Sequence, residues 1–433
     1  MRDGRIVEAR NACELGRRWF GDGVVSDEVR VRGERVIFEE ALDAAAELLG
    51  GARRVLVYLA PDTSCEAQRA AVALADRLHG VVDNITSSTA ASGLLAAQRR
   101  GRPTASLGEI RNRADLLVFW GVDPAERYPR FLTRYAPDPE GIFVPGGRSD
   151  RTVVAIDIGD ELGPEDADMR ISLSADDEQG ALARLRASTL ERVAEAAAAT
   201  AAGKPPRTGE KDGHAARPGG ALGALFDRFD SARYAVIVYD AEPHDGDGDD
   251  GEARDRSWRA EALIALTQQL NASIRCSLMA LRAGGNRNGA EAVMTWQTGF
   301  PMTVDYSRGV PRYRPDEASA ALLERGAVDA MVIVGNARAS EIPSMDGVPR
   351  VVIGPWASQT EPAAEIAIDT GVAGIHENGM AFRMDDIPLP LRASVPGPSS
   401  APDTAFVVEA LDAGIRARAR SGGNRPKGEG GGR

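Results

Sequence analysis

Short apolar runs alternate with amphipathic segments along most of this chain. The first is VLVYLAP at residues 55–61, which lies between helical patterns at 39–51 and 64–80. Later runs of the same kind are LLVFWG (116–121), RTVVAIDIGDE (151–161), YAVIVYD (234–240), MVIVG (331–335), RVVIG (350–354) and AEIAIDT (364–370). Short apolar runs suit buried parallel strands, and the helical patterns between them indicate βαβ units. The sequence therefore predicts an α/β fold of mostly parallel, doubly wound sheets.

Composition places the chain among ordinary globular proteins. Its 433 residues are enough for two or three domains, and 43% are hydrophobic and 27% charged. A net charge of -12 argues against a nucleic-acid or anionic-membrane partner, which would require a basic face. No apolar run reaches the ~20 residues of a membrane span, and the start has no signal-peptide core. We therefore expect a cytoplasmic protein with neither nucleic-acid nor membrane contacts.

The order of the runs predicts a domain inserted into another. We expect a first α/β domain from residues 39–150 and 326–400, interrupted by a second α/β domain at 151–325. Residues 1–38 would precede both. Gly- and Pro-rich, polar composition predicts mobile loops near 201–220 and 244–256, and a flexible tail at 420–433.

Aromatic residues gather in one stretch, TWQTGFPMTVDYSRGVPRYRPDE at 295–317, although aromatics make up only 5% of the chain. Its glycines and prolines favour a fixed, irregular loop over a helix or strand. A shaped surface for docking or ligand binding is one interpretation. A well-packed connection between domains is the other, and we favour it, because aromatics anchor cores and interfaces more often than cofactor sites.

Residues suited to metal binding or catalysis are few. Cys13, Cys65 and Cys276 lie far apart, and the four histidines have no metal-binding spacing, so no self-contained transition-metal site is indicated. His376 and Glu377 could form an acid–base pair, but a loop hydrogen bond is the simpler interpretation. No GxGxxG follows the first predicted strand, and neither a Walker nor a GxSxG motif occurs in the sequence.

Asp83 and Asn84 follow a predicted strand, where an open α/β sheet binds ligands, although both are equally good turn residues. From the residues alone, the chain is an α/β protein with loops that bind a ligand or a partner.

Several segments together resemble the B subunit of formylmethanofuran dehydrogenase, a family of the molybdopterin oxidoreductase superfamily. They span nearly the whole chain in the expected order: GRIVEARNACELG (4–16), VVDNITSST (81–89), ADLLVFWGVDPAERYPRFLTRY (114–135), the stretch at 295–317 and ENGMAFRMDDIPLPLR (377–392). The resemblance implies a formate dehydrogenase-like core without the iron-sulfur domain and the C-terminal barrel. It also implies that residues 1–38 are the remnant of a cluster domain.

Active members of this family hold tungsten or molybdenum between two pterin guanine dinucleotides, with a cysteine as metal ligand and a 4Fe-4S cluster nearby. Counting from Asp83 and Asn84 places Thr89 at the position of that cysteine, and a hydroxyl is a poor substitute for a thiolate. Cys13 matches the last cluster ligand, but its three partners are absent, and one thiolate cannot hold the cluster. The resemblance therefore implies that metal, pterins and cluster have all been lost.

This pattern is similar to a branch that works in one-carbon metabolism, in the formaldehyde oxidation of methylotrophs. There the B subunit is part of a formyltransferase/hydrolase complex, which moves a formyl group from formyl-tetrahydromethanopterin to a methanofuran-like carrier and releases formate. Its other subunits are amidohydrolase-like, formyltransferase and β-helical chains. The resemblance implies a non-catalytic structural subunit.

Two alternatives stay open. The chain could be an active tungsten- or molybdenum-pterin oxidoreductase subunit interconverting formate and CO2, with Thr89 or a water in place of the thiolate. It could also be a non-redox module that binds a pterin or nucleotide in a remnant cleft. Candidate residues for that cleft are Asp83, Asn84, Gly121, Asp157 and, in the GGNRNG loop at 284–289, Arg287.

Overall fold

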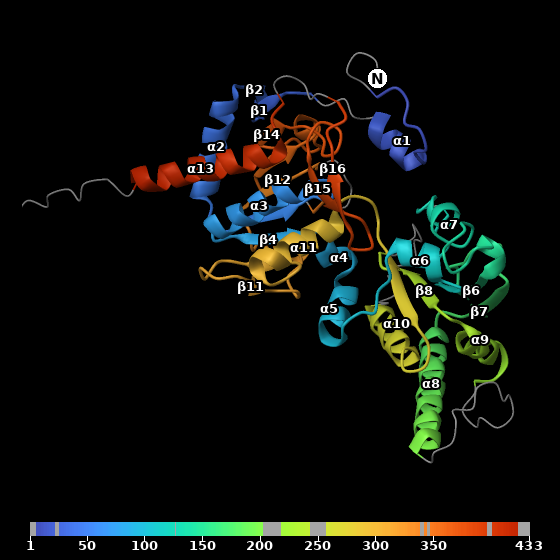
Figure 1. Cartoon of the computed structure of the whole chain (residues 1–433). Helices are drawn as coiled ribbons and strands as arrows, with labels where there is room; N and C mark the ends of the chain where they lie inside the picture. The colour runs from blue at the N-terminus through green and yellow to red at the C-terminus, as the bar shows by residue number, and fades with distance from the viewer. Residues whose placement is uncertain are drawn as a thin grey trace, which may run out of the picture. The chain divides into compact units, whose positions relative to one another are not determined.

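A computed structural model describes residues 6–21, 26–125, 127–201, 218–242, 257–337, 342–343, 347–395 and 401–422 (Figure 1). The chain divides into two compact units. The first combines residues 1–88 with 284–433, and the second comprises residues 89–283. The chain thus leaves the first unit once and returns to it.

The described part of the first unit contains a nine-stranded sheet. Its strand order is β11 (Arg312–Tyr313), β10 (Val304–Asp305), β4 (Val81–Asn84), β3 (Val55–Leu59), β12 (Ala330–Val334), β13 (Arg350–Gly354), β14 (Ile366–Asp369), β1 (Val29–Val31) and β2 (Glu34–Arg35). The five strands from β4 to β14 run parallel, and the short outer strands are antiparallel. A separate hairpin joins β15 (Gly379–Phe382) to β16 (Pro388–Leu391).

Burial on both faces explains why this sheet is built from continuous apolar runs. In β3, Val55, Val57 and Leu59 belong to one hydrophobic cluster, while Leu56 and Tyr58 belong to another. The first cluster includes apolar residues of α2 (Phe38–Gly51), α3 (Cys65–Arg77), α11 (Arg287–Thr298) and α13 (Thr404–Gly422). The second includes residues of α12 (Ser319–Glu324). The sheet is therefore doubly covered.

The described part of the second unit contains five parallel strands. Their order is β7 (Met169–Leu173), β6 (Thr152–Ile158), β5 (Leu116–Trp120), β8 (Ala235–Asp240) and β9 (Cys276–Leu281). The helices of this unit are α5 (Ala91–Arg100), α6 (Leu107–Arg113), α7 (Phe131–Arg134), α8 (Glu178–Ala201), α9 (Gly220–Ser231) and α10 (Ser257–Leu270). Residues of α8, α9 and α10 share one core cluster with the strands.

The expected α/β fold with mostly parallel sheets is confirmed. The division of the chain, however, falls at 88/89 and 283/284 rather than at 150/151 and 325/326. Strand β5 causes the first shift, because it pairs with β6 and β8 instead of joining β3. At the other boundary, β10 pairs with β4 of the first sheet. An apolar run predicts a strand but does not specify the sheet to which it belongs.

The aromatic stretch is more regular than we expected. Its first four residues are the last turn of α11, and residues further on form β10 and β11. Phe300 stacks on Tyr313 with ring centroids 4.9 Å apart, and Trp296 packs against Phe382 at 5.8 Å. Trp296 nevertheless remains 60% exposed. The stretch is therefore mainly packed within the first unit.

Several expected loops fall where little or nothing is described. Residues 202–217 and 243–256 lie outside the described residues, as do 423–433 of the expected tail, whereas residues 420–422 are the end of α13. The sequence interpretation also omitted β7, β9 and the long helix α8. Among the described residues, no helix is long and apolar enough to cross a membrane.

Candidate functional site

Each sheet has one place where ligands usually bind in this class of fold. In open α/β sheets this is the carboxyl edge, at the point where the strand order reverses direction. The reversal lies between β3 and β12 in the first sheet and between β5 and β8 in the second. We call these the first and second switch points and describe each unit by itself.

Asp83 is the next-to-last residue of β4, at the carboxyl edge of the first sheet, as predicted, but both of its side-chain oxygens accept hydrogen bonds from within the chain. Oδ1 accepts from the backbone N–H and hydroxyl of Thr303 at 3.0 and 2.9 Å. Oδ2 accepts from the hydroxyl of Ser87 at 2.7 Å and from the N–H and hydroxyl of Ser319 at 2.9 and 2.5 Å. Burial raises the pKa of Asp83, and these bonds oppose the rise. The carboxylate therefore connects three segments: the helix that follows β4, the residue before β10 and the start of α12.

Asn84 is also fully buried and used internally. Its amide donates to the carbonyl of Pro301 at 2.9 Å, and its Oδ1 accepts from the N–H of Thr86 at 3.0 Å. The hydroxyl of Thr86 in turn donates to Glu291 of α11 at 2.6 Å. The side chains of Asp83 and Asn84 are therefore both used in hydrogen bonds within the first unit.

The two positions that the resemblance links to a metal and a cluster, Thr89 and Cys13, are both partly accessible. Thr89 is the last residue of α4 (Thr86–Thr89) and is partly buried. Cys13 is a free, partly exposed thiol just before α1 (Glu14–Gly21). Within the described ranges, no group of three or more His, Cys, Asp or Glu residues could hold a metal ion.

At the first switch point, Asp62 is the notable residue, and the sequence did not reveal it. Its Oδ1 accepts from the N–H of Asn336 at 3.0 Å, whereas Oδ2 is buried without a hydrogen-bond partner among the described residues. Burial raises the pKa of this carboxyl. Gly335 follows β12 with φ +119°, and a Cβ there would lie 2.8 Å from Ala60 and 2.6 Å from Thr63. Only glycine permits this close approach.

Glu377 accepts hydrogen bonds at the amino end of α13. Its Oε1 accepts from the N–H and hydroxyl of Thr404 at 2.7 and 2.9 Å. Burial raises the pKa of Glu377 to about 7, with smaller contributions from Asp403 and Asp62. His376 accepts from the N–H of Val372 through Nδ1 at 3.1 Å, as expected for a loop hydrogen bond.

The 284–289 loop does not present its arginine to solvent. Arg287 is 4% exposed, and its Nε donates to the carbonyl of Gly284 at 3.2 Å. The N–H of Asn286 donates to the carbonyl of Pro61, and its side-chain amide donates to the carbonyl of Thr63 at 2.9 Å. The loop therefore fastens α11 to the segment after β3.

The other two predicted residues, Gly121 and Asp157, lie at the carboxyl edge of the second sheet. Gly121 has φ +58°, and a Cβ there would lie 3.0 Å from Glu161. Asp157 accepts from the N–H of Gly163 at 2.9 Å and from Arg170 at 2.5 Å. Both positions are therefore filled by neighbouring parts of the same unit.

Arginine–carboxylate pairs dominate this second edge. Arg127, part of the 114–135 segment, donates to Asp240 at the end of β8 and to the carbonyl of Glu242 at 2.7 Å. Because β5 and β8 flank the second switch point, this side chain bridges it. Glu242 also accepts from Arg282 at 2.5 Å, and both side chains are buried.

A second buried pair joins α8 to α10. Glu178 accepts from Arg259 at 2.6 and 2.8 Å and from the indole of Trp120 at 2.8 Å, and Arg259 also pairs with Glu161 at 2.8 Å. Side-chain exposure is 1% for Glu178 and 5% for Arg259. Sequence reasoning missed these pairs because their members are far apart in the chain and match no motif.

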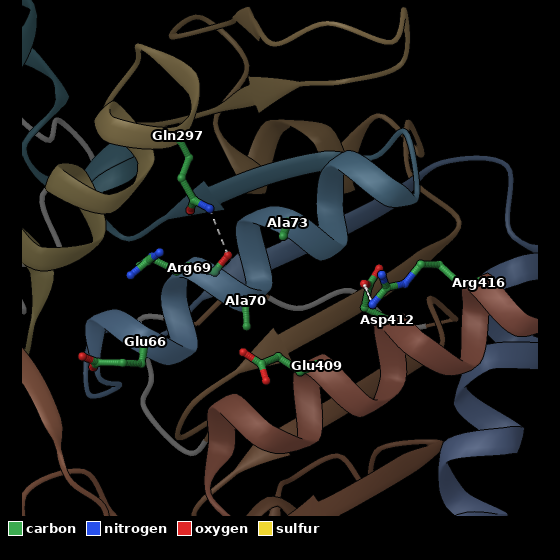
Figure 2. A pocket seen from close by; sticks show the side chains of 8 residues that line it. All are labelled: Glu66, Arg69, Ala70, Ala73, Gln297, Glu409, Asp412 and Arg416. Atoms are coloured by element: carbon green, nitrogen blue, oxygen red, sulfur yellow. Dashed lines mark hydrogen bonds and ion pairs between the residues drawn. The ribbon is translucent and has the colours of Figure 1, made fainter.

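The first unit also has a groove of about 340 Å³ between α3 and α13 (Figure 2). Its floor includes Ala70 and Ala73, and Gln297 of α11 donates to the carbonyl of Arg69 at 3.4 Å. On one wall, Asp412 pairs with Arg416 at 2.8 Å and with Arg77 at 3.2 Å. The groove lies between two helices and contains none of the predicted site residues.

Comparisons with known proteins gave consistent results. No family model matches the sequence. Over 422 residues the chain is 30% identical to the B subunit of tungsten-containing formylmethanofuran dehydrogenase 2 from Methanocaldococcus jannaschii, covering 92% of this chain and 90% of that protein. The protein of the same name from Methanococcus maripaludis is 29% identical over 426 residues, covering 95% and 93%.

Among solved structures, the chain matches one chain of the formyltransferase/hydrolase complex from Methylorubrum extorquens, determined with methylofuran. The TM-score is 0.70 and the sequence identity 23%, with coverage of 90% of this chain and 99% of that one. At this identity the match shows a shared fold.

Proposed function

The chain belongs to the family of formylmethanofuran dehydrogenase B subunits, and from this premise we propose that it is a non-catalytic structural subunit of a formyltransferase/hydrolase complex. The complex would transfer a formyl group from formyl-tetrahydromethanopterin to a methanofuran-like carrier and release formate. Its chemistry would belong to the amidohydrolase-like and formyltransferase subunits, and a β-helical subunit would complete it. This chain would serve as their docking framework in the cytoplasm.

The observation that carries the proposal is the bridged second switch point. A dinucleotide in this crevice would need free donors for its phosphates at the ends of β5 and β8. Instead, Arg127 binds Asp240 and the Glu242 carbonyl, and Arg259 is committed to two glutamates. These residues do not suit a pterin dinucleotide, because its phosphates would meet arginines already neutralised by carboxylates of the same unit.

The donor set at the expected metal position supports the same proposal. Thr89 offers a hydroxyl where the family uses a thiolate, and soft metals prefer thiolate. Cys13 is a single thiol, whereas a 4Fe-4S cluster needs four. An active tungsten or molybdenum enzyme would therefore need a different ligand and a different route for electrons.

The first switch point favours a second candidate, a non-redox module that binds a pterin or nucleotide. Oδ2 of Asp62 is buried with no donor among the described residues, and a buried carboxylate oxygen is costly without one. An N–H group on a heterocyclic ligand would supply that donor. Under this candidate function the first unit binds a ligand, whereas under the first candidate function it binds none.

The test is the cofactor content of the intact complex, purified from its native host. Tungsten, molybdenum and iron are measured per copy of this chain by elemental analysis, and pterin by extraction and fluorescence. A tungsten-containing relative, handled in parallel, serves as the positive control. We expect neither tungsten nor molybdenum nor pterin, with any iron assigned to the partner subunits.

The outcomes separate the candidates. Tungsten or molybdenum with stoichiometric pterin would overturn the structural role and make Thr89 the first residue to mutate. Pterin or nucleotide without either metal would favour the binding module. In that case Asp62→Asn should lower the bound amount, while the exposed Glu361→Gln should not.

A further inference from the structure

Two large apolar side chains occupy the tip of a tight turn in the second unit. Gly141 and Val144 exchange backbone hydrogen bonds of 3.1 and 3.2 Å, leaving Ile142 and Phe143 as the two tip residues. Ile142 is 76% exposed and Phe143 51% exposed. Such tips usually carry Gly, Asn or Asp, whose backbones suit the turn. The turn itself therefore gives no reason for these residues.

The turn is rigidly supported from beneath. Arg151 is buried and donates to four backbone carbonyls, at 2.6–3.1 Å, those of Arg111, Ala114, Pro137 and Pro139. Asn112 accepts from the N–H of Phe143 through its carbonyl at 2.9 Å and from the N–H of Ile142 through Oδ1 at 3.3 Å. The two apolar side chains are thus held outwards by a fixed backbone.

Arginines border the tip. The guanidinium of Arg113 lies 5.0 Å from the centroid of the Phe143 ring, and Arg233 donates to the Phe143 carbonyl at 3.3 Å. Asp115 balances Arg233 at 3.0 Å. Exposed acidic residues of the same loop are Asp138 and Glu140. The side chain that covers the aromatic ring itself is cationic.

The position of the turn separates it from the candidate ligand site. Arg113 and Asp115 precede β5, Arg151 precedes β6, and Arg233 precedes β8. The turn therefore lies at the amino edge of the second sheet, opposite the switch point. A role in holding a cofactor cannot explain it.

We propose that Ile142 and Phe143 are the anchor by which this chain docks onto another subunit of its complex. The anchor enters an apolar pocket whose rim is acidic and faces Arg113. This inference rests on the proposed function for the existence of such a partner. Interface centres are enriched in aromatic side chains and arginine, and a pre-ordered anchor loses little conformational entropy on binding. The cationic Arg113 beside the ring selects an acidic rim over a basic one.

Replacing both anchor residues tests the docking surface. The complex is purified from its native host through a tag on this chain, carrying Ile142→Ser together with Phe143→Ser. We expect the affinity for one partner subunit to fall about tenfold or more, read as the fraction of that subunit retained on dilution. Arg113→Glu should weaken binding of the same partner. Leu190→Ser in α8, where the leucine is already 52% exposed, is the matched control and should retain every subunit.

A photo-crosslinking amino acid at position 142 of the otherwise unchanged chain gives a second readout that does not depend on a polar variant folding. The expected product joins position 142 to an acidic peptide of a different subunit. Retention of all subunits by the serine variant, or crosslinks only to a second copy of this chain, would overturn the proposal.

Cofactor content keeps the two proposals separate. Tungsten-pterin in a complex that still loses a subunit with the serine variant would refute the structural role alone. A serine-variant complex that retains every subunit and contains neither tungsten nor pterin would refute the docking surface alone.

Discussion

The two carboxyl edges stabilise their buried carboxylates in opposite ways. At the edge of the first sheet, Asp83, Asp62 and Glu377 are held by hydroxyl and backbone N–H donors, which carry no charge. At the edge of the second sheet, Glu178 and Glu242 are each held by a buried arginine. Neutral donors compensate a buried charge only partly, and burial raises the pKa of each of these three carboxyls.

The difference predicts two kinds of sensitivity. At the second edge, the free energy of unfolding should depend on keeping both members of each arginine–glutamate pair, because removing one member leaves an uncompensated buried charge. The free energy of unfolding should depend on pH through the first edge, because the folded chain is more stable when the carboxyls there are protonated.

The largest effect is expected from Arg259→Met on the second edge. It leaves the carboxylate of Glu178 buried with only the Trp120 indole as a partner, which should cost about 3–5 kcal/mol in the free energy of unfolding. Urea unfolding followed by circular dichroism measures it. The double variant Arg259→Met with Glu178→Met should recover much of the loss.

Arg99→Met provides the control, since this exposed arginine pairs with Glu261 and should contribute no more than about 1 kcal/mol. Equal losses from Arg99→Met and Arg259→Met would remove the distinction between buried and exposed pairs.

A smaller loss is expected from Asp83→Ala on the first edge. The change strands the backbone N–H groups of Thr303 and Ser319, and each unsatisfied buried donor costs about 1–3 kcal/mol. Removing the carboxyl also relieves the cost of its own burial, so the net loss should be roughly 2–4 kcal/mol. Thermal unfolding gives the value. Ser88→Ala, at an exposed hydroxyl in the same segment, should leave it almost unchanged. A comparable loss of stability from Asp83→Ala and Ser88→Ala would show that the effect comes from disturbing this segment of the chain and not from removing the carboxylate.

Much of the fold could be predicted because each buried strand carries its own signal. All five residues of β3 and of β5 are buried, and their apolar runs stand out in the sequence. Strand β9 was missed, because Cys276 and Ser277 weaken its pattern. The assignment of β5 to the second sheet could not be predicted from the sequence, because it depends on pairing with residues more than thirty positions away.

The candidate site likewise has features that the sequence could predict and features that it could not. Asp83 and Asn84 could be placed at a strand end from the sequence, but their internal hydrogen bonds depend on Thr303, Pro301 and Ser319. The pair of Glu178 and Arg259 joins residues 81 positions apart, and no spacing rule connects them. Whether Thr89 and Cys13 mark lost ligands stays a prediction.

The pH dependence of the first edge should be visible at Glu377. Its pKa is raised from 4.5 to about 7, so the folded chain binds this proton more tightly than the unfolded chain does. Stability from this group is complete below pH 4.5 and is lost as pH rises towards about 7. Glu377→Gln keeps an oxygen for Thr404 and should remove this loss, on the order of 2 kcal/mol. Unfolding free energies of both chains from pH 5 to 8 measure it.

A constant difference between Glu377→Gln and the unchanged chain across this range would mean that the carboxyl does not titrate there. Glu361→Gln, at an exposed position, corrects for the change in net charge.

The smallest effect is a gain in stability, expected from Asp62→Asn. The Oδ1 that accepts from Asn336 is kept, while the buried oxygen without a donor becomes an uncharged amide. Because burial raises the pKa of Asp62 above 3.8, its ionised form destabilises the folded chain increasingly as pH rises. The variant should therefore be more stable by about 1 kcal/mol at pH 8, and by less at pH 5.5. Thermal unfolding of the isolated chain at both pH values measures the difference. A loss at pH 8 would instead indicate that Oδ2 has a donor in solution, and the first edge would then resemble the second, with every buried carboxylate oxygen compensated.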